Sequence, residues 1–160
     1  LNGWLSELAF VPVDFNENSM VDEWSGDYGC GVKYFSQDSV IKLAENGGFK
    51  FDEGLSPAEK LKVIQKLMNE GDPLARTIYE DIGIYLGYTL PYYAMFYDIK
   101  HVLLLGRVTS GEGGNIVISK AKEVLASEFP ELKFELEMPD EKNRRVGQSI
   151  AAASLAASRK

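Results

Sequence analysis

A glycine-rich stretch between residues 101 and 118 has the residue types and the spacing to hold a phosphate group. It opens with the apolar run Val102–Leu105, which predicts a short strand buried on both faces. The run breaks at Gly106, and a loop then leads into a helix expected from about Asn115. That loop contains Gly111, Gly113 and Gly114. Glycines let a ligand approach the backbone, and the first N–H groups of a helix attract an anion. The alternative is that these glycines only reverse the chain.

The part of the chain up to residue 71 is expected to contain an extended segment, a long loop and two helices. The segment Leu1–Val13 favours extended structure, and Asp14–Tyr28 is polar and predicts a long loop. A first helix is expected from Ser36 or Asp38 to Asn46. A second is expected from Ser56, because Ser, Pro and Glu at residues 56, 57 and 59 form a typical helix start, and it ends before the glycine at residue 71.

The helix expected over Leu74–Ile99 is unusually apolar and aromatic, which predicts that it is mostly buried. Pro91 should kink it, because proline removes a backbone donor and clashes with the preceding turn. Gly83 and Gly87 share one face, where another helix or a strand could approach closely. We interpret its aromatic stripe as core or a subunit interface rather than a stacking platform for a sugar; the stripe consists of Tyr85, Tyr88 and Tyr92.

Three further elements follow the glycine-rich stretch. They are a helix over Ile118–Phe129, a half-exposed edge strand over Leu132–Met138 and an alanine-rich helix over Val146–Ser158. This order predicts the α/β class, with helices packed on a mixed sheet.

Composition limits the functions that this segment can have. Its 160 residues predict a single domain, and a net charge of −7 argues against nucleic-acid binding. The sequence has no apolar run long enough for a membrane span. A single cysteine, Cys30, is typical of a reducing compartment, so we expect a cytoplasmic protein. Because the chain opens on Leu1, we expect residues 1–160 to be a fragment of a longer, two-domain protein.

Five short motifs, in this order, resemble the C-terminal half of the ROK family of bacterial sugar kinases and related repressors. Glu7–Phe10 is similar to the Glu-x-Gly-His sugar motif of the family. The run Gly26–Cys30, with Tyr-Phe-Ser at residues 34–36, resembles the end of its cysteine-rich zinc motif. Gly71–Ala75 is similar to the lead into the long helix, and Val102–Val108 to the adenosine-binding turn. The closing helix of the family corresponds to residues 146–156. The resemblance covers nearly the whole chain.

The resemblance implies an actin-like ATPase (ribonuclease H-like) fold and a part in ATP-dependent phosphorylation of a hexose-type sugar. Glu7 would bind sugar hydroxyls, and a nucleotide with Mg²⁺ would lie against Gly106, Arg107 and the glycines at 111, 113 and 114. The catalytic Asp of the family belongs to the N-terminal domain. We therefore expect no catalytic residue here, no activity from the segment alone, and a homo-oligomer that includes the missing domain.

Several residues depart from the family pattern. Phe10 replaces the histidine that supports sugar and zinc, and Val32 replaces a sugar-binding glutamate. Glu23 and Ser25 stand where two motif cysteines would be, leaving Cys30 alone. Structural zinc takes four ligands, so we expect no zinc. Three hypotheses follow from these differences. The chain is half of a sugar kinase, a non-catalytic sugar-sensing domain of a regulator, or a degenerate dimerisation module.

Overall fold

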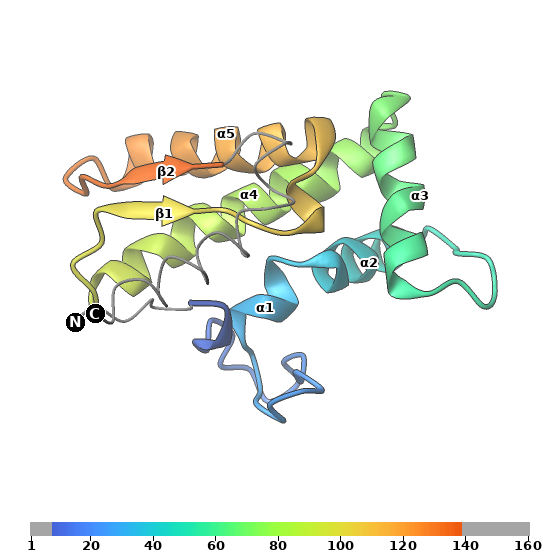
Figure 1. Cartoon of the computed structure of the whole chain (residues 1–160), viewed down its shortest axis with the longest axis horizontal. Coiled ribbons are helices and arrows are strands. Elements are labelled where there is room, and N and C mark those ends of the chain that lie inside the picture. Colours follow the sequence, from blue (N-terminus) through green and yellow to red (C-terminus); the bar gives the residue numbers. More distant parts are fainter. Residues whose placement is uncertain (1–7, 139–160) are drawn as a thin grey trace, which may run out of the picture.

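Two long helices lying side by side organise the fold: α4, Pro73–Ala94, and α5, Gly111–Glu128 (Figure 1). They belong to a computed structural model that describes residues 8–138. Within that range five α-helices accompany a two-stranded parallel sheet, so the described part of the chain is mixed α/β. The expected α/β class is confirmed at this level.

Glycine makes the close packing of α4 on α5 possible. A Cβ atom added at Gly83 would lie 2.7 Å from the Cβ of Lys120, and one added at Gly87 would lie 2.6 Å from the Cβ of Val124. Real Cβ atoms do not come this close, so the two backbones approach where only glycine fits. The prediction that this glycine face receives another element is confirmed, and the element is α5.

Three shorter helices precede α4, and two of them begin where local sequence places them. They are α1, Gly31–Tyr34; α2, Gln37–Asn46; and α3, Pro57–Asn69. The Ser36 side chain accepts a hydrogen bond from the Asp38 N–H and caps α2. Ser56 and Glu59 form a complete capping box on α3. Both predicted helix starts are confirmed.

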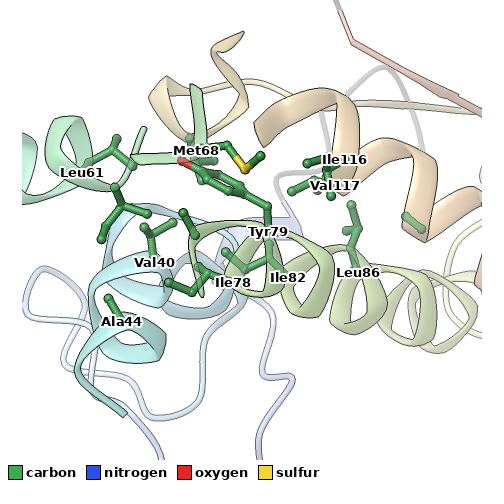
Figure 2. Packing of buried hydrophobic residues seen from close by; sticks show 14 of the residues in the cluster. Val40, Ala44, Leu61, Met68, Ile78, Tyr79, Ile82, Leu86, Ile116 and Val117 are labelled. Atoms are coloured by element: carbon green, nitrogen blue, oxygen red, sulfur yellow. The ribbon is translucent and has the colours of Figure 1, made fainter. Parts of the chain in front are cut away.

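The core lies where α2, α3 and α5 pack against α4 (Figure 2). Tyr79 of α4 extends toward Met68 of α3, and Leu86 of α4 lies near Ile116 and Val117 of α5 (Figure 2). Every labelled residue of this cluster is buried. This core supports the glycine-rich stretch, because the turn over residues 107–109 packs on α5 and α2.

The sheet consists of β1, His101–Leu103, and β2, Glu135–Glu137. The strands are parallel with Val102 opposite Leu136, and α5 connects them. Both strands lie on the same side of the α4–α5 pair (Figure 1). Because side chains alternate across a strand, Leu136 is buried whereas Leu103 is 55% exposed. The prediction of a strand buried on both faces is therefore wrong, and among the described residues no antiparallel strand makes this sheet mixed.

Three other boundaries differ from expectation. Helix α5 begins at Gly111 instead of about Asn115, because tertiary contacts hold a glycine-rich first turn that has poor intrinsic helix propensity. Helix α4 contains Pro91 and ends at Ala94, before Ile99. Leu8–Phe10 forms a 3₁₀ turn rather than a strand. The expected helix over residues 146–158 lies outside the described residues.

Candidate functional site: the turn between β1 and α5

The turn that follows β1 is exposed and depends on glycine. Gly106 has φ +113°, a conformation that other residues rarely adopt, and a Cβ added there would meet no atom within 4 Å. The backbone at Gly106 thus faces open space at the carboxyl end of β1. In α/β proteins ligands bind in the crevice outside the carboxyl ends of the strands.

A short 3₁₀ turn, Arg107–Thr109, continues from Gly106 and is held from two sides. The Thr109 hydroxyl donates to the Gly106 carbonyl at 2.8 Å, and the Gln65 side-chain amide of α3 donates to the Arg107 carbonyl at 2.9 Å. The Arg107 side chain is exposed and forms no ion pair with the residues described. The turn is therefore fixed while its guanidinium group is available to a ligand.

Gly113 and Gly114 are placed differently from the sequence prediction. Both are buried in the first turn of α5, not in a loop. A Cβ at Gly113 would lie 2.6 Å from the Tyr79 ring, and one at Gly114 would lie 2.1 Å from the Thr109 carbonyl oxygen. The expectation that they form a loop is corrected, because close packing on α4 and on the turn requires glycine at both positions.

Gly111 stays exposed at the start of α5, with φ +69°. The Ser110 side chain does not cap this helix. Glu112 follows in the first turn and accepts a hydrogen bond from the Asn115 side chain at 3.2 Å. Of the five residues predicted to contact a nucleotide, Gly106, Arg107 and Gly111 are thus accessible, and the two buried glycines position them.

The segment that continues from the first motif lies beside the start of α1. Glu7 itself is outside the described residues, but the Gly31 N–H donates to the Val11 carbonyl at 3.0 Å, and Pro12 and Cys30 form an antiparallel bridge. The Phe10 ring contacts Trp24 at a tilt of 43°, with centroids 5.5 Å apart. The structure thereby places the residues that follow the first motif beside the end of the second motif, with Val11 bonded to a residue twenty positions further along the chain.

The residues at the zinc-motif positions do not suit a zinc ion. Cys30 is fully buried, and burial raises the pKa of its thiol. The Glu23 carboxylate is engaged by the Lys33 ammonium at 2.8 Å. No group of three or more His, Cys, Asp or Glu residues within 8–138 is arranged to hold a metal. A single buried thiol without histidine lacks the donor set of a zinc site.

Helix α4 carries a feature that the sequence analysis missed. Tyr85 and Tyr88 are 43% and 51% exposed, so of the two alternatives, core or a subunit interface, the core is wrong for these two side chains. Helical spacing places them on one face, one turn apart. They face a cavity. The sequence did contain a signal for this site: two tyrosines at helical spacing on an otherwise apolar helix.

Comparison with known proteins adds no relative: no family model matches the sequence, and no curated protein does. None of the helices in the described region is long and apolar enough to cross a lipid bilayer.

Proposed function

We propose that this chain is the C-terminal half of a ROK-like sugar kinase with an actin-like ATPase fold, and that it supplies one wall of the nucleotide site. One observation carries the proposal. The unit β1–α5–β2 is a parallel strand–helix–strand unit whose first turn, at Gly106, is open at the carboxyl end of β1. This is the position at which α/β proteins receive a nucleotide.

The residues of the turn have distinct parts in this proposal. Gly106 allows the adenosine portion of ATP to lie against the backbone, because no side chain occupies that space. Arg107 offers an exposed guanidinium group, which pairs well with phosphate oxygens. Gly111, at the start of α5, leaves backbone N–H groups accessible to an anion. Gly113 and Gly114 fix this turn against Tyr79 and Thr109.

Phosphoryl transfer depends mainly on positioning and on charge stabilisation by groups from both halves of such an enzyme. In this proposal the base, the phosphate loop and the Mg²⁺ ligands would come from an N-terminal domain, as in the family. Glu7 would accept hydrogen bonds from sugar hydroxyls. Because Phe10 packs on Trp24, a hydrophobic surface stands where the family has a histidine. The sugar site would therefore be less polar than in the family.

The nucleotide site can be tested by titrating the longest available protein that contains this segment with a fluorescent ATP analogue. Gly106→Ala would place a methyl group in the open space and should weaken binding about tenfold or more, as expected when a nucleotide must approach backbone. Gly54→Ala is the matched control, because Gly54 also has a positive φ, +84°, and open space beside it. Unchanged binding by a folded Gly106→Ala protein would refute the proposed site.

A second candidate function follows from Phe10. This residue packs on Trp24, whereas the family has at this position a polar histidine that supports the sugar. The segment would then be the sugar-sensing domain of a regulator. ATP-dependent phosphorylation of a hexose by the full-length protein supports the kinase, whereas sugar binding without turnover supports the sensor. Dimerisation without any ligand binding would support the degenerate module.

A further inference from the structure

A cavity of about 460 Å³ lies among α1, α2, α4 and the loop over residues 13–20. None of the residues that line it belongs to the turn after β1. Its volume is in the range of cavities that bind small molecules, which combine apolar walls with a few placed polar groups. The cavity is thus a second candidate site with a lining of its own.

One wall of the cavity is aromatic. Tyr85 and Tyr88 project from α4 and are about half exposed. The Tyr88 ring makes an edge contact with Phe129, with centroids 5.9 Å apart, which limits its motion. Tyrosine rings offer an apolar face and a hydroxyl to the same ligand.

Another part of the lining contains a hydrogen-bonded network. The Tyr34 hydroxyl donates to the Asp14 carboxylate and accepts from the Met20 N–H at 3.2 Å. Asp14 also accepts the Asn16 N–H at 3.0 Å. The Tyr34 hydroxyl lowers the pKa of Asp14 most, so the carboxylate is charged at neutral pH. The network fixes a charged acceptor in the cavity.

Three other polar side chains at the cavity have hydrogen-bonding capacity left over. Asn18, Lys42 and Asn46 make no side-chain hydrogen bond or ion pair with the residues described. Lys42 and Asn46 are one helical turn apart on α2, so they present their donors side by side. The ammonium of Lys42 and the carboxylate of Asp14 leave the lining without net charge.

We propose that this cavity binds a neutral monosaccharide at a site separate from Glu7 and from the turn at Gly106. The C–H face of a pyranose would lie on the tyrosine rings, and its hydroxyls would bond the two asparagine amides, Lys42 and the one lone pair of Asp14 that Tyr34 and Asn16 leave. Amides and hydroxyls match a hydroxyl-rich ligand. A lining whose two charges cancel gives a sugar phosphate no net electrostatic attraction. The proposal goes beyond the proposed phosphoryl transfer, because it requires neither ATP nor Glu7.

The experiment is saturation-transfer NMR with D-glucose and D-galactose on the full-length protein without ATP. Tyr85→Ala should weaken binding of at least one of these sugars about five- to tenfold, the range expected for loss of one aromatic contact. Asn46→Ala tests the polar wall, and it should weaken sugar binding by less than Tyr85→Ala does. Tyr28→Ala is the control for Tyr85, because Tyr28 is 63% exposed and lies outside the cavity. Circular dichroism establishes that each variant is folded.

Two further comparisons separate this inference from the proposed kinase. Binding that survives Glu7→Gln but is lost in Tyr85→Ala and Asn46→Ala supports the cavity. Binding that is lost in Glu7→Gln but unchanged in both cavity variants would overturn the inference and leave the kinase proposal standing. Glucose 6-phosphate that binds at the cavity more tightly than glucose would overturn the assignment to a neutral sugar.

Discussion

Gly87 of α4 faces Val124 of α5 so closely that a Cβ added to the glycine would lie 2.6 Å from the Cβ of the valine. Two helices that approach each other this closely need a residue without a side chain at the point of contact. The contact, repeated one turn earlier at Gly83, joins the helix at the centre of the core to the helix that connects the strands.

We predict that Gly87→Ala destabilises the protein by about 1–2 kcal/mol, because overpacking costs about 1–3 kcal/mol and alanine returns up to about 1 kcal/mol of helix propensity. Urea unfolding measures the change. The double variant Gly87→Ala with Val124→Gly should lose less than the sum of the single variants, since the second change removes the Cβ atom that clashes. Wild-type stability in Gly87→Ala would show that α5 can move away at no cost.

Tyr79 is fully buried, and its hydroxyl has no hydrogen-bond partner among the described residues. A buried hydroxyl without a partner costs free energy. Tyr79→Phe should therefore leave the free energy of unfolding unchanged or raise it by up to about 1 kcal/mol. Tyr79→Ala should lower it by about 3–5 kcal/mol, because that change leaves a cavity. A clear loss of stability in Tyr79→Phe would mean that the hydroxyl has a partner.

Ser56→Ala should destabilise the protein by about 1 kcal/mol, because it removes the side-chain oxygen that caps the first turn of α3. Thermal unfolding provides the measurement. Ser119→Ala is the comparison, since Ser119 is exposed within α5 and makes no capping bond. An equal loss in both variants would contradict a specific role for the cap.

The Tyr34–Asp14 hydrogen bond predicts a pH-dependent contribution to stability. The Tyr34 hydroxyl lowers the pKa of Asp14 from its ordinary value of 3.8, so the folded state prefers the charged carboxylate. Its contribution is complete above pH 3.8 and is lost as the pH falls through the lowered pKa. Tyr34→Phe should therefore cost about 1 kcal/mol at pH 7 and less at pH 3.

Unfolding by urea between pH 7 and pH 3 measures this dependence. Tyr97→Phe serves as the control, because the Tyr97 hydroxyl has no hydrogen bond to the described residues, and its effect should not change with pH. If the effect of Tyr34→Phe on stability is constant over this range, the hydrogen bond does not depend on the ionisation of Asp14, and the prediction is wrong.

Local sequence determined the helix starts and the small residues of the helix contact. Ser56, Pro57 and Glu59 satisfy the N–H groups of α3 with atoms a few residues away, so no distant contact is needed to place this start. The spacing of Gly83 and Gly87 defined a close-packing face for the same reason.

Tertiary structure decided which element fills that face and which glycines remain accessible. Gly106 and Gly113 look alike in the sequence, yet the first faces open space and the second lies against the Tyr79 ring. Tyr79 and Tyr85 are the same residue type on the same helix. Of these two side chains, only that of Tyr85 faces the cavity, because α2 and the 13–20 loop leave space there. Accessibility depends on what packs from distant parts of the chain, and the pattern around a single residue does not contain that information.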